Sequence, residues 1–247
     1  MSTISPPRPG PEAPAGDRST AVEEIPVLGE GFVRLDDAMA DDRSVVNSAR
    51  VSFGVRKDVL DDADRGLIRF LLRERHGTPF EHNAFRFHVR CPIFVAREWM
   101  RHRQGSFNEL SGRYAEIPDS FYVPAAEDVR TQVGKPGAYR FEPVDAERAE
   151  RTRAAIEESY RAAYAAYRRM LDDGVAREVA RTVLPVGINT EFYWTLNARS
   201  LMNFLSLRNA ETAQREIRRY AEAVEQLFAT RMPLTHAAFV DGGRIAP

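Results

Sequence analysis

The chain has 247 residues, of which 43% are hydrophobic and 29% are charged, and its formal net charge is -1. This composition is typical of a soluble globular protein with a sizeable core, and the near-neutral charge argues against broad binding to nucleic acid. No apolar run approaches the roughly 20 residues that span a bilayer, no signal peptide is recognisable, and the single cysteine, Cys91, excludes an intramolecular disulfide. We therefore expect a cytoplasmic protein that has neither a membrane nor nucleic acid as its partner.

The N-terminal part of the chain divides into a tail and the start of a folded domain. Residues 1–25 are rich in proline, alanine, glycine and serine, and we expect a disordered tail there, followed by a single domain over 26–247. Apolar residues at helical spacing predict a helix over 67–75. Alternating apolar and charged residues predict a half-buried strand over 85–89. Pro92 then ends the strand and begins a helix that runs to about residue 100.

The middle of the chain is less regular. Glycines and an asparagine interrupt residues 101–113, so we expect largely a loop there. A short strand is predicted over 121–123, and the proline, glycine and charged residues of 125–145 predict a surface excursion. An apolar stripe ending at a glycine then predicts a long helix over about 145–173.

The C-terminal part is predicted to be mainly helical. We expect a short helix over about 176–182, an extended segment over 190–195, and helices over 198–207 and 213–231. Helices and strands do not alternate in the rhythm of a doubly wound fold. We therefore predict an α+β fold, in which helices pack around a modest, mostly antiparallel sheet.

Residues 101–113 hold three arginines, a histidine and a glutamate among small polar residues. A guanidinium keeps its proton at any working pH, and its fork of donors fits phosphate oxygens. The backbone N–H groups of such a loop also bind anions. These residue types indicate a phosphate-binding loop, although an ordinary solvated loop is the commoner explanation for charges of this kind.

The order of the residues favours the phosphate-binding loop. Residues 101–113 resemble the signature R-H-R-x-x-S-x-N-E-x-S-x-R of the flavin-dependent thymidylate synthases at all eight specified positions. Residues 76–82 resemble the H-x-T-P-F-E-H turn of that family, and Arg50-Val51-Ser52 resembles its A-R-V-S segment. Residues 197–208 resemble its N-A-R-S-L-x-N-F-x-x-L-R block, and Arg181 fits a further position.

This resemblance implies a reaction, its cofactors and an assembly. The implied reaction is the reductive methylation of dUMP to dTMP. In it, 5,10-methylenetetrahydrofolate is the one-carbon donor, FAD reduced by NADPH is the hydride donor, and tetrahydrofolate is released. Members of the family are homotetramers, so the resemblance also implies self-association with active sites shared between copies of the chain.

The motif matches also imply residue roles. Those implied to contact FAD are Ser52, His76, Thr78, Glu81, Arg101, His102, Arg103, Glu109, Asn197, Ala198, Arg199 and Asn203. Those implied to bind dUMP are Glu98, Trp99, Met100, Arg101, Glu109, Leu110, Ser111, Gly112, Arg113, Arg181 and Arg208. Arg208 matches the position credited with stabilising ionised uracil and is the predicted catalytic residue, because a guanidinium provides a fixed positive charge. The chain departs from the family at Glu98, where many members have glutamine, and at Thr212, where some have a flavin-contacting histidine.

Other chemistry finds less support in the sequence. The five histidines show no metal-binding spacing, so no metal site is expected. Neither Cys91, at the end of an apolar strand, nor Ser111 has the neighbours that activate a nucleophile.

Two alternatives to the synthase stay open. One is an arginine-rich nucleic-acid-binding module, although the near-neutral charge argues against it. The other is a relative that binds flavin and a uridine nucleotide for different chemistry, or that merely oxidises NADPH.

Overall fold

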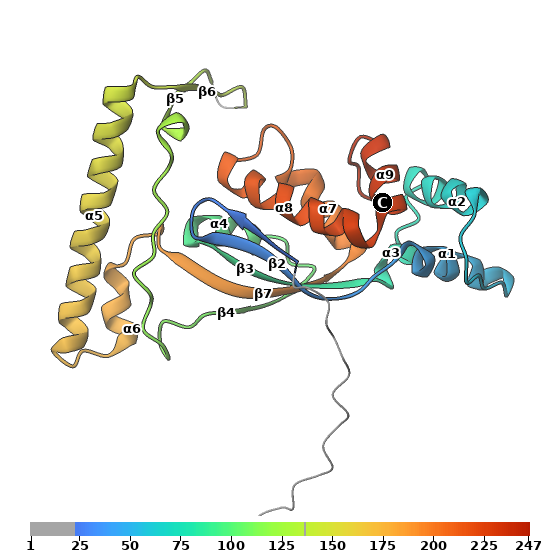
Figure 1. Ribbon diagram of the computed structural model, residues 1–247, viewed down its shortest axis with the longest axis horizontal. Coiled ribbons are helices and arrows are strands. Elements are labelled where there is room, and N and C mark those ends of the chain that lie inside the picture. Colours follow the sequence, from blue (N-terminus) through green and yellow to red (C-terminus); the bar gives the residue numbers. More distant parts are fainter. Residues whose placement is uncertain (1–22, 136) are drawn as a thin grey trace, which may run out of the picture.

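The computed structural model describes residues 23–135 and 137–247. Its centre is a five-stranded sheet in which every neighbouring pair is antiparallel (Figure 1). In spatial order the strands are β1 (Glu23–Val27), β2 (Gly31–Met39), β3 (Ala84–Pro92), β7 (Asn189–Asn197) and β4 (Ser106–Glu109). The chain therefore has the predicted α+β fold, in a single domain.

Nine α-helices occur in the described part of the chain. They are α1 (Asp42–Arg50), α2 (Asp62–Arg73), α3 (Thr78–Glu81), α4 (Ile93–Trp99), α5 (Ala146–Asp172), α6 (Arg177–Ala180), α7 (Ala198–Arg208), α8 (Arg215–Arg231) and α9 (Pro233–Asp241). Short 3-10 turns occupy Val51–Phe53, Ala126–Asp128 and Arg181–Val183. Within the described ranges, no helix combines the length and the apolar character needed to cross a membrane.

The two central strands give the sheet one apolar face. On β3, Phe85, Phe87 and Val89 are fully buried, while the alternate residues point to the other face. On β7, Trp194 and Phe192 point into the same core. Helices α7 and α8 cover this apolar face (Figure 1), which places the core between them and the sheet.

Aromatic rings join this sheet face to the helices. Trp99, from the last turn of α4, is fully buried, with ring centroids 5.3 Å from Trp194 and 4.9 Å from Phe204 of α7. Tyr220 of α8 closes the cluster at 6.0 Å from Trp99. This packing fixes the end of α4 and the middle of α7 relative to each other, and both carry predicted site residues.

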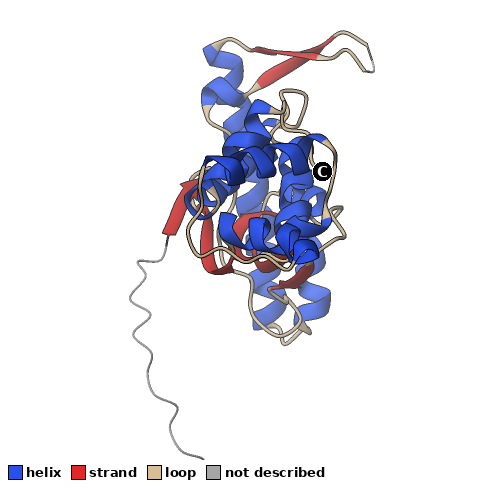
Figure 2. Ribbon diagram, turned by 90° about the vertical axis from the view of Figure 1, so that its right-hand side faces the viewer, coloured by secondary structure: helices blue, strands red, loops and turns tan. Residues whose placement is uncertain are grey.

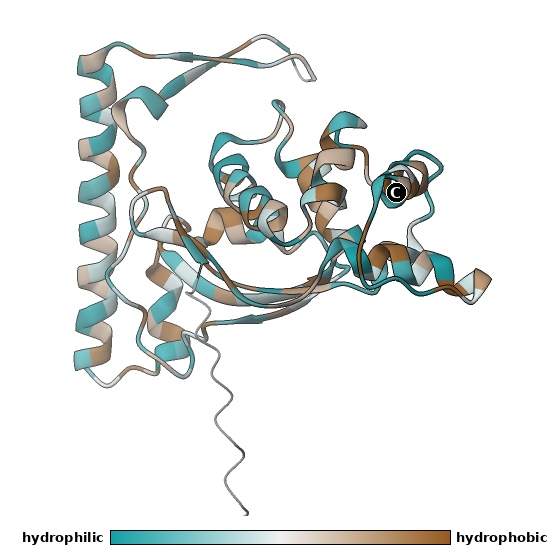
Figure 3. Cartoon of the chain, turned by 45° about the vertical axis from the view of Figure 1, so that its right-hand side comes forward, coloured by the Kyte–Doolittle hydropathy of each residue, from teal (hydrophilic) through white to brown (hydrophobic). Residues whose placement is uncertain are grey.

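Helix α5 stands at one end of the sheet, as Figure 1 shows, and confirms the long helix predicted over 145–173. Hydrophilic and hydrophobic residues are interleaved along it (Figure 3), and only Ala149 and Tyr167 are buried on it. The predicted surface excursion contains a hairpin of β5 (Arg130–Val133) and β6 (Arg140–Pro143). Figure 2 shows this hairpin reaching beyond the helices.

Several sequence predictions need correction. Strand β1 begins at Glu23, so the folded domain starts before residue 26, where it was predicted to start. The rest of the predicted tail, residues 1–22, lies outside the described part. Residues 101–113 are largely a loop, as predicted, but Ser106–Glu109 within them pair with β7 as strand β4, which was not predicted. The predicted strand over 121–123 is reduced to a single bridge between Phe121 and Ile188.

Candidate active site

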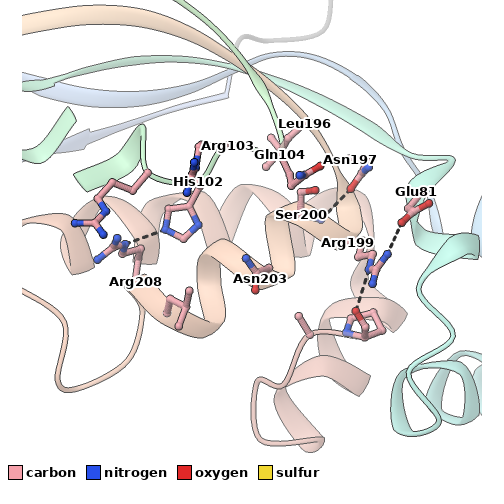
Figure 4. Close-up of a pocket in the computed structure, with 14 residues that line it drawn as sticks. Glu81, His102, Arg103, Gln104, Leu196, Asn197, Arg199, Ser200, Asn203 and Arg208 are labelled. Carbon is pink, nitrogen blue, oxygen red and sulfur yellow. Dashed lines mark hydrogen bonds and ion pairs between the residues drawn. The ribbon is translucent and has the colours of Figure 1, made fainter. Parts of the chain in front are cut away.

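A cavity of about 1060 Å³ opens beside α7, at the edge of the sheet. Its walls come from α3, the segment after α4, the end of β7, α7 and the C-terminal residues (Figure 4). The lining residues are Glu81, Arg101, His102, Arg103, Gln104, Leu196, Asn197, Arg199, Ser200, Asn203, Leu207, Arg208, Ala246 and Pro247. The volume lies slightly above the usual range of about 300–1,000 Å³ for small-molecule sites.

The amphipathic character of α7 explains one wall of the cavity. The helix begins after Asn197, whose side-chain oxygen accepts the N–H of Ser200 at 2.8 Å and so caps the first turn. Residues four apart lie on one helix face, so Arg199 and Asn203 both face the cavity. Ala198, another predicted FAD contact, is fully buried and does not line this cavity.

Two predicted FAD contacts meet across this cavity. Arg199 Nη1 donates to Glu81 Oε1 at 2.6 Å, which ties α7 to α3 (Figure 4). Arg199 Nε donates to the carbonyl oxygen of Pro247 at 3.0 Å, so the C-terminal segment forms part of the wall. Arg244 holds that segment in place through Glu225 on α8, with Nη2 to Oε1 at 3.1 Å.

A second cavity, of about 520 Å³, adjoins the first at Arg199, which lines both. It contains the predicted flavin contacts Ser52, His76 and Thr78. The sequence analysis missed Arg75, which lines this cavity with a φ of 58°. Its position directly before the family-like turn at 76–82 could have indicated it as a site residue. It also missed the residues Gln104, Leu196, Ser200, Leu207, Ala246 and Pro247 of the first cavity.

Arg208 is held by two partners at the far end of the first cavity. Its Nε donates to His102 Nε2 at 2.9 Å, its Nη1 donates to Glu98 Oε2 at 3.2 Å, and its Nη2 donates to the Glu98 carbonyl oxygen at 3.3 Å. Burial and the neighbouring Arg208 charge lower the pKa of His102 to about 4. Burial raises the pKa of Glu98, although Arg208 opposes that shift.

The predicted dUMP contacts do not gather in one place within a chain. Strand β4 runs along the edge of β7, at about 3.3 Å per residue. It therefore separates Arg101 from Ser111, Gly112 and Arg113, and none of these last three residues lines the cavity at Arg208.

The residues beyond β4 instead lie against α6 and the turn after it. A Cβ atom on Gly112 would come within 3.2 Å of Arg181 Cδ, and Arg113 Nε lies 3.5 Å from Glu178 Oε2. Arg181 and Arg113 are both exposed. The predicted dUMP set is thus divided into a group at Arg208 and a group at Arg181.

The remaining predicted contacts lie between these two groups or in the core. Glu109 accepts a hydrogen bond from Thr190 Oγ1 at 2.7 Å, and Leu110 is exposed beside it. Met100, which follows α4, is partly buried and packs against the core. Trp99 is fully buried, so neither its side chain nor its backbone is exposed to a substrate in this chain.

The chain matches known proteins over most of its length. A family model described as "Thymidylate synthase complementing protein" matches residues 34–234. The flavin-dependent thymidylate synthase of Streptomyces coelicolor is 49% identical over 239 residues, which is 91% of this chain and 96% of that one. The chain belongs to the flavin-dependent thymidylate synthase family.

Further comparisons agree with this membership. The flavin-dependent thymidylate synthase of Pseudothermotoga lettingae is 47% identical over 217 residues, covering 87% of this chain and 93% of its own. The crystal structure of the UMP/dUMP methylase PolB from Streptomyces cacaoi bound with 5-Br UMP has a TM-score of 0.82 and 45% identity, over 88% of this chain and 96% of that one. The structure of PolB bound with 5-Br dUMP has a TM-score of 0.83 and 44% identity, over 90% and 100% of the two chains. As a flavin-dependent thymidylate synthase, the protein is an enzyme and a methyltransferase.

Proposed function

We propose that the protein converts dUMP, 5,10-methylenetetrahydrofolate, NADPH and a proton into dTMP, tetrahydrofolate and NADP⁺, with FAD as its bound cofactor. The observation that carries this proposal is the convergence of two distant motif blocks, 101–103 and 197–208, on one cavity of about 1060 Å³. The solved relative PolB is named a UMP/dUMP methylase, which supports a uridine nucleotide as the substrate.

The donors around the two adjoining cavities fit a dinucleotide such as FAD. Arg101, Arg103 and Arg199 bring permanent positive charge to the first cavity, and charge-assisted hydrogen bonds from such groups suit a diphosphate. Ser52 and Thr78 add hydroxyl groups in the second cavity. When bound, reduced FAD supplies the hydride that completes the methyl group. The arginines would bind and orient the cofactor.

Arg208 suits the electrostatic part of the reaction. Methylation at C5 requires the uracil ring to become electron-rich, and a fixed cation beside the ring stabilises that charge. Two of the five N–H groups of Arg208 are free of protein partners in the contacts above, so they remain for a substrate. In this role Arg208 acts through its charge and accepts no proton.

Sharing of the active site between copies of the chain is part of the proposal. The separation of Arg208 from Arg113 by β4 supports it, because a single chain does not bring both residues to one cavity. A homotetramer in which Arg113 and Arg181 of one chain meet Arg208 of another would complete the dUMP site. The folate would then bind at the same junction.

The flavin spectrum of the purified protein tests the cofactor assignment. We expect a yellow protein, or one that binds added FAD, whose flavin absorbance bleaches when NADPH is added under anaerobic conditions. A protein that stays colourless after incubation with FAD would overturn the proposal. Offering dUMP and UMP in parallel then separates a thymidylate synthase from a methylase of both nucleotides.

A further inference from the structure

The guanidinium of Arg208 is oriented by protein partners at all three of its nitrogens. His102 accepts from Nε at 2.9 Å, while Glu98 accepts from Nη1 through its carboxylate at 3.2 Å and from Nη2 through its backbone carbonyl at 3.3 Å. The planar guanidinium fork leaves little freedom once three donors are fixed. Glu98 therefore aims Arg208, and it also places a negative charge directly beside it.

The charges around Glu98 are nearly balanced without a ligand. Arg208 of α7 and Arg101, which follows α4, are the cations that favour its ionised form, and Glu216 of α8 is the carboxylate that opposes it. Glu216 is itself held by Tyr122 Oη at 3.2 Å and by Gln214 Nε2 at 2.8 Å.

Glu98 is also partly withdrawn from water. Its side chain is 29% exposed and that of Arg208 is 21% exposed. Burial raises the pKa of Glu98 above its ordinary value, with Glu216 acting in the same direction. The phosphate of a nucleotide whose ring lies at Arg208 would add negative charge to the same site and would raise that pKa again.

We propose that Glu98 is a positioning residue for Arg208 and that nucleotide binding is coupled to the uptake of one proton by Glu98. This inference rests on the proposed function, because it takes a uridine monophosphate as the ligand. With Glu98 ionised, its charge offsets that of Arg208. With Glu98 protonated, the unprotonated oxygen of its carboxyl group still accepts the Nη1 hydrogen bond, while the full positive charge of Arg208 is available to the nucleotide.

The coupling has a defined direction. Free protein with ionised Glu98, one proton and the nucleotide give a complex with neutral Glu98, so no electron transfer is involved. Linkage requires the nucleotide affinity to fall by up to tenfold per pH unit as pH rises, between the pKa of Glu98 in the free protein and its higher pKa in the complex. A Glu98→Gln substitution places an uncharged amide at this position, which would mimic the neutral acid and abolish this dependence.

Titration calorimetry of the FAD-loaded full-length protein with dUMP tests the proposal. Measurements in buffers of different ionisation enthalpy give the number of protons taken up per site, over pH 6–8. The phosphate of dUMP titrates near pH 6, so binding of its dianion releases protons. The parent protein should nevertheless take up protons, in net, when it binds dUMP at pH 7. The Glu98→Gln variant should take up as much as one proton fewer per site, and its affinity for dUMP should no longer fall as pH rises.

Two further variants separate positioning from mere stability. Glu222→Gln makes the same charge change on α8, outside the site, where Glu222 Oε2 lies 3.0 Å from Arg219 Nη1. This control variant should take up as many protons on binding dUMP as the parent. Glu98→Ala removes the acceptor as well as the charge, so its kcat should fall further than that of Glu98→Gln at every pH.

The outcomes are distinct from those that test the proposed function. Binding of dUMP by the parent with no proton uptake at pH 7 overturns the inference alone, even if Glu98→Gln fails to fold. Equal uptake by the parent and Glu98→Gln also overturns it. Absence of dUMP binding by the parent overturns the proposed function and the inference together.

Discussion

Arg208 Nε donates a hydrogen bond to His102 Nε2 at 2.9 Å, and this contact joins two motif blocks whose residues lie 106 positions apart. Arginine has no acceptor atom, so the bond requires an unprotonated Nε2. Burial and Arg208 lower the pKa of His102 to about 4, which agrees with that requirement. His102 is therefore neutral near pH 7, with its proton on Nδ1.

The first prediction concerns pH and His102. Its ordinary pKa of 6.5 exceeds the folded value of about 4, so the unfolded chain binds more protons between these values. The contribution of His102 to stability is thus complete above pH 6.5 and is lost as pH falls towards 4. His102→Gln keeps an acceptor but cannot titrate. As pH falls from 7 to 4.5, the Tm of this variant should therefore rise relative to that of the parent. Thermal melts at each pH measure the difference, and a difference in Tm that stays constant would contradict the prediction.

The second prediction separates turnover from cofactor binding at Arg208. Removing a preorganised charge at a developing anion commonly costs about 10²–10³-fold in kcat, so Arg208→Ala should lose turnover by at least that factor. FAD affinity should change much less, because other arginines line the cofactor cavity. Steady-state rates and fluorescence titration with FAD provide the two readouts. Loss of FAD at unchanged Tm would instead place Arg208 in the cofactor site.

The third prediction concerns Arg199, which lines both adjoining cavities. Losing a charge-assisted hydrogen bond costs about 1.5–3 kcal/mol, or roughly 10- to 150-fold in affinity, so Arg199→Ala should weaken FAD binding by about that factor. Arg219→Ala is the matched control, because Arg219 is a similarly exposed arginine whose partner Glu222 lies outside the cavities. Equal FAD affinities for the two variants would show that Arg199 does not contact the cofactor.

The fourth prediction concerns sharing of active sites. If Arg208 and Arg113 of different chains serve one site, each alanine variant should be inactive alone. Tetramers co-purified from cells that express both variants should regain about a quarter of the parent activity, because random mixing leaves that fraction of sites intact.

A matched pair of variants controls that experiment. Arg208→Ala and Arg101→Ala alter residues of the same cavity, so mixing them should restore nothing. If the pair with Arg113→Ala also stays inactive in mixed assemblies, both arginines act from one chain and the shared site is wrong.

Strong periodicity explains which elements could be predicted from the sequence. The alternation over 85–89 has the period of a strand, and the apolar stripe over 145–173 has the period of a helix. The structure has the strand β3 and the helix α5 at these positions. Strand β4 was missed because Ser106–Glu109 contains a single apolar residue, Phe107, which is too little for a periodic signal. It is a strand because its backbone pairs with β7, and such pairing depends on tertiary structure.

The site was predictable only in part, for a similar reason. Motif order indicated Arg208, His102 and Glu98 separately, but their mutual hydrogen bonds depend on how α4 and α7 pack around Trp99. The separation of Arg113 from Arg208 was also invisible in a continuous motif, because β4 extends the chain between them.

The most direct test of the central claim follows the hydrogen at C5 of dUMP. We expect the FAD-loaded protein, supplied with NADPH, to release tritium from [5-³H]dUMP only when 5,10-methylenetetrahydrofolate is present, and to form dTMP in equal amount. NADPH oxidation without tritium release under those conditions, in a protein that binds both FAD and dUMP, would contradict the proposed synthase.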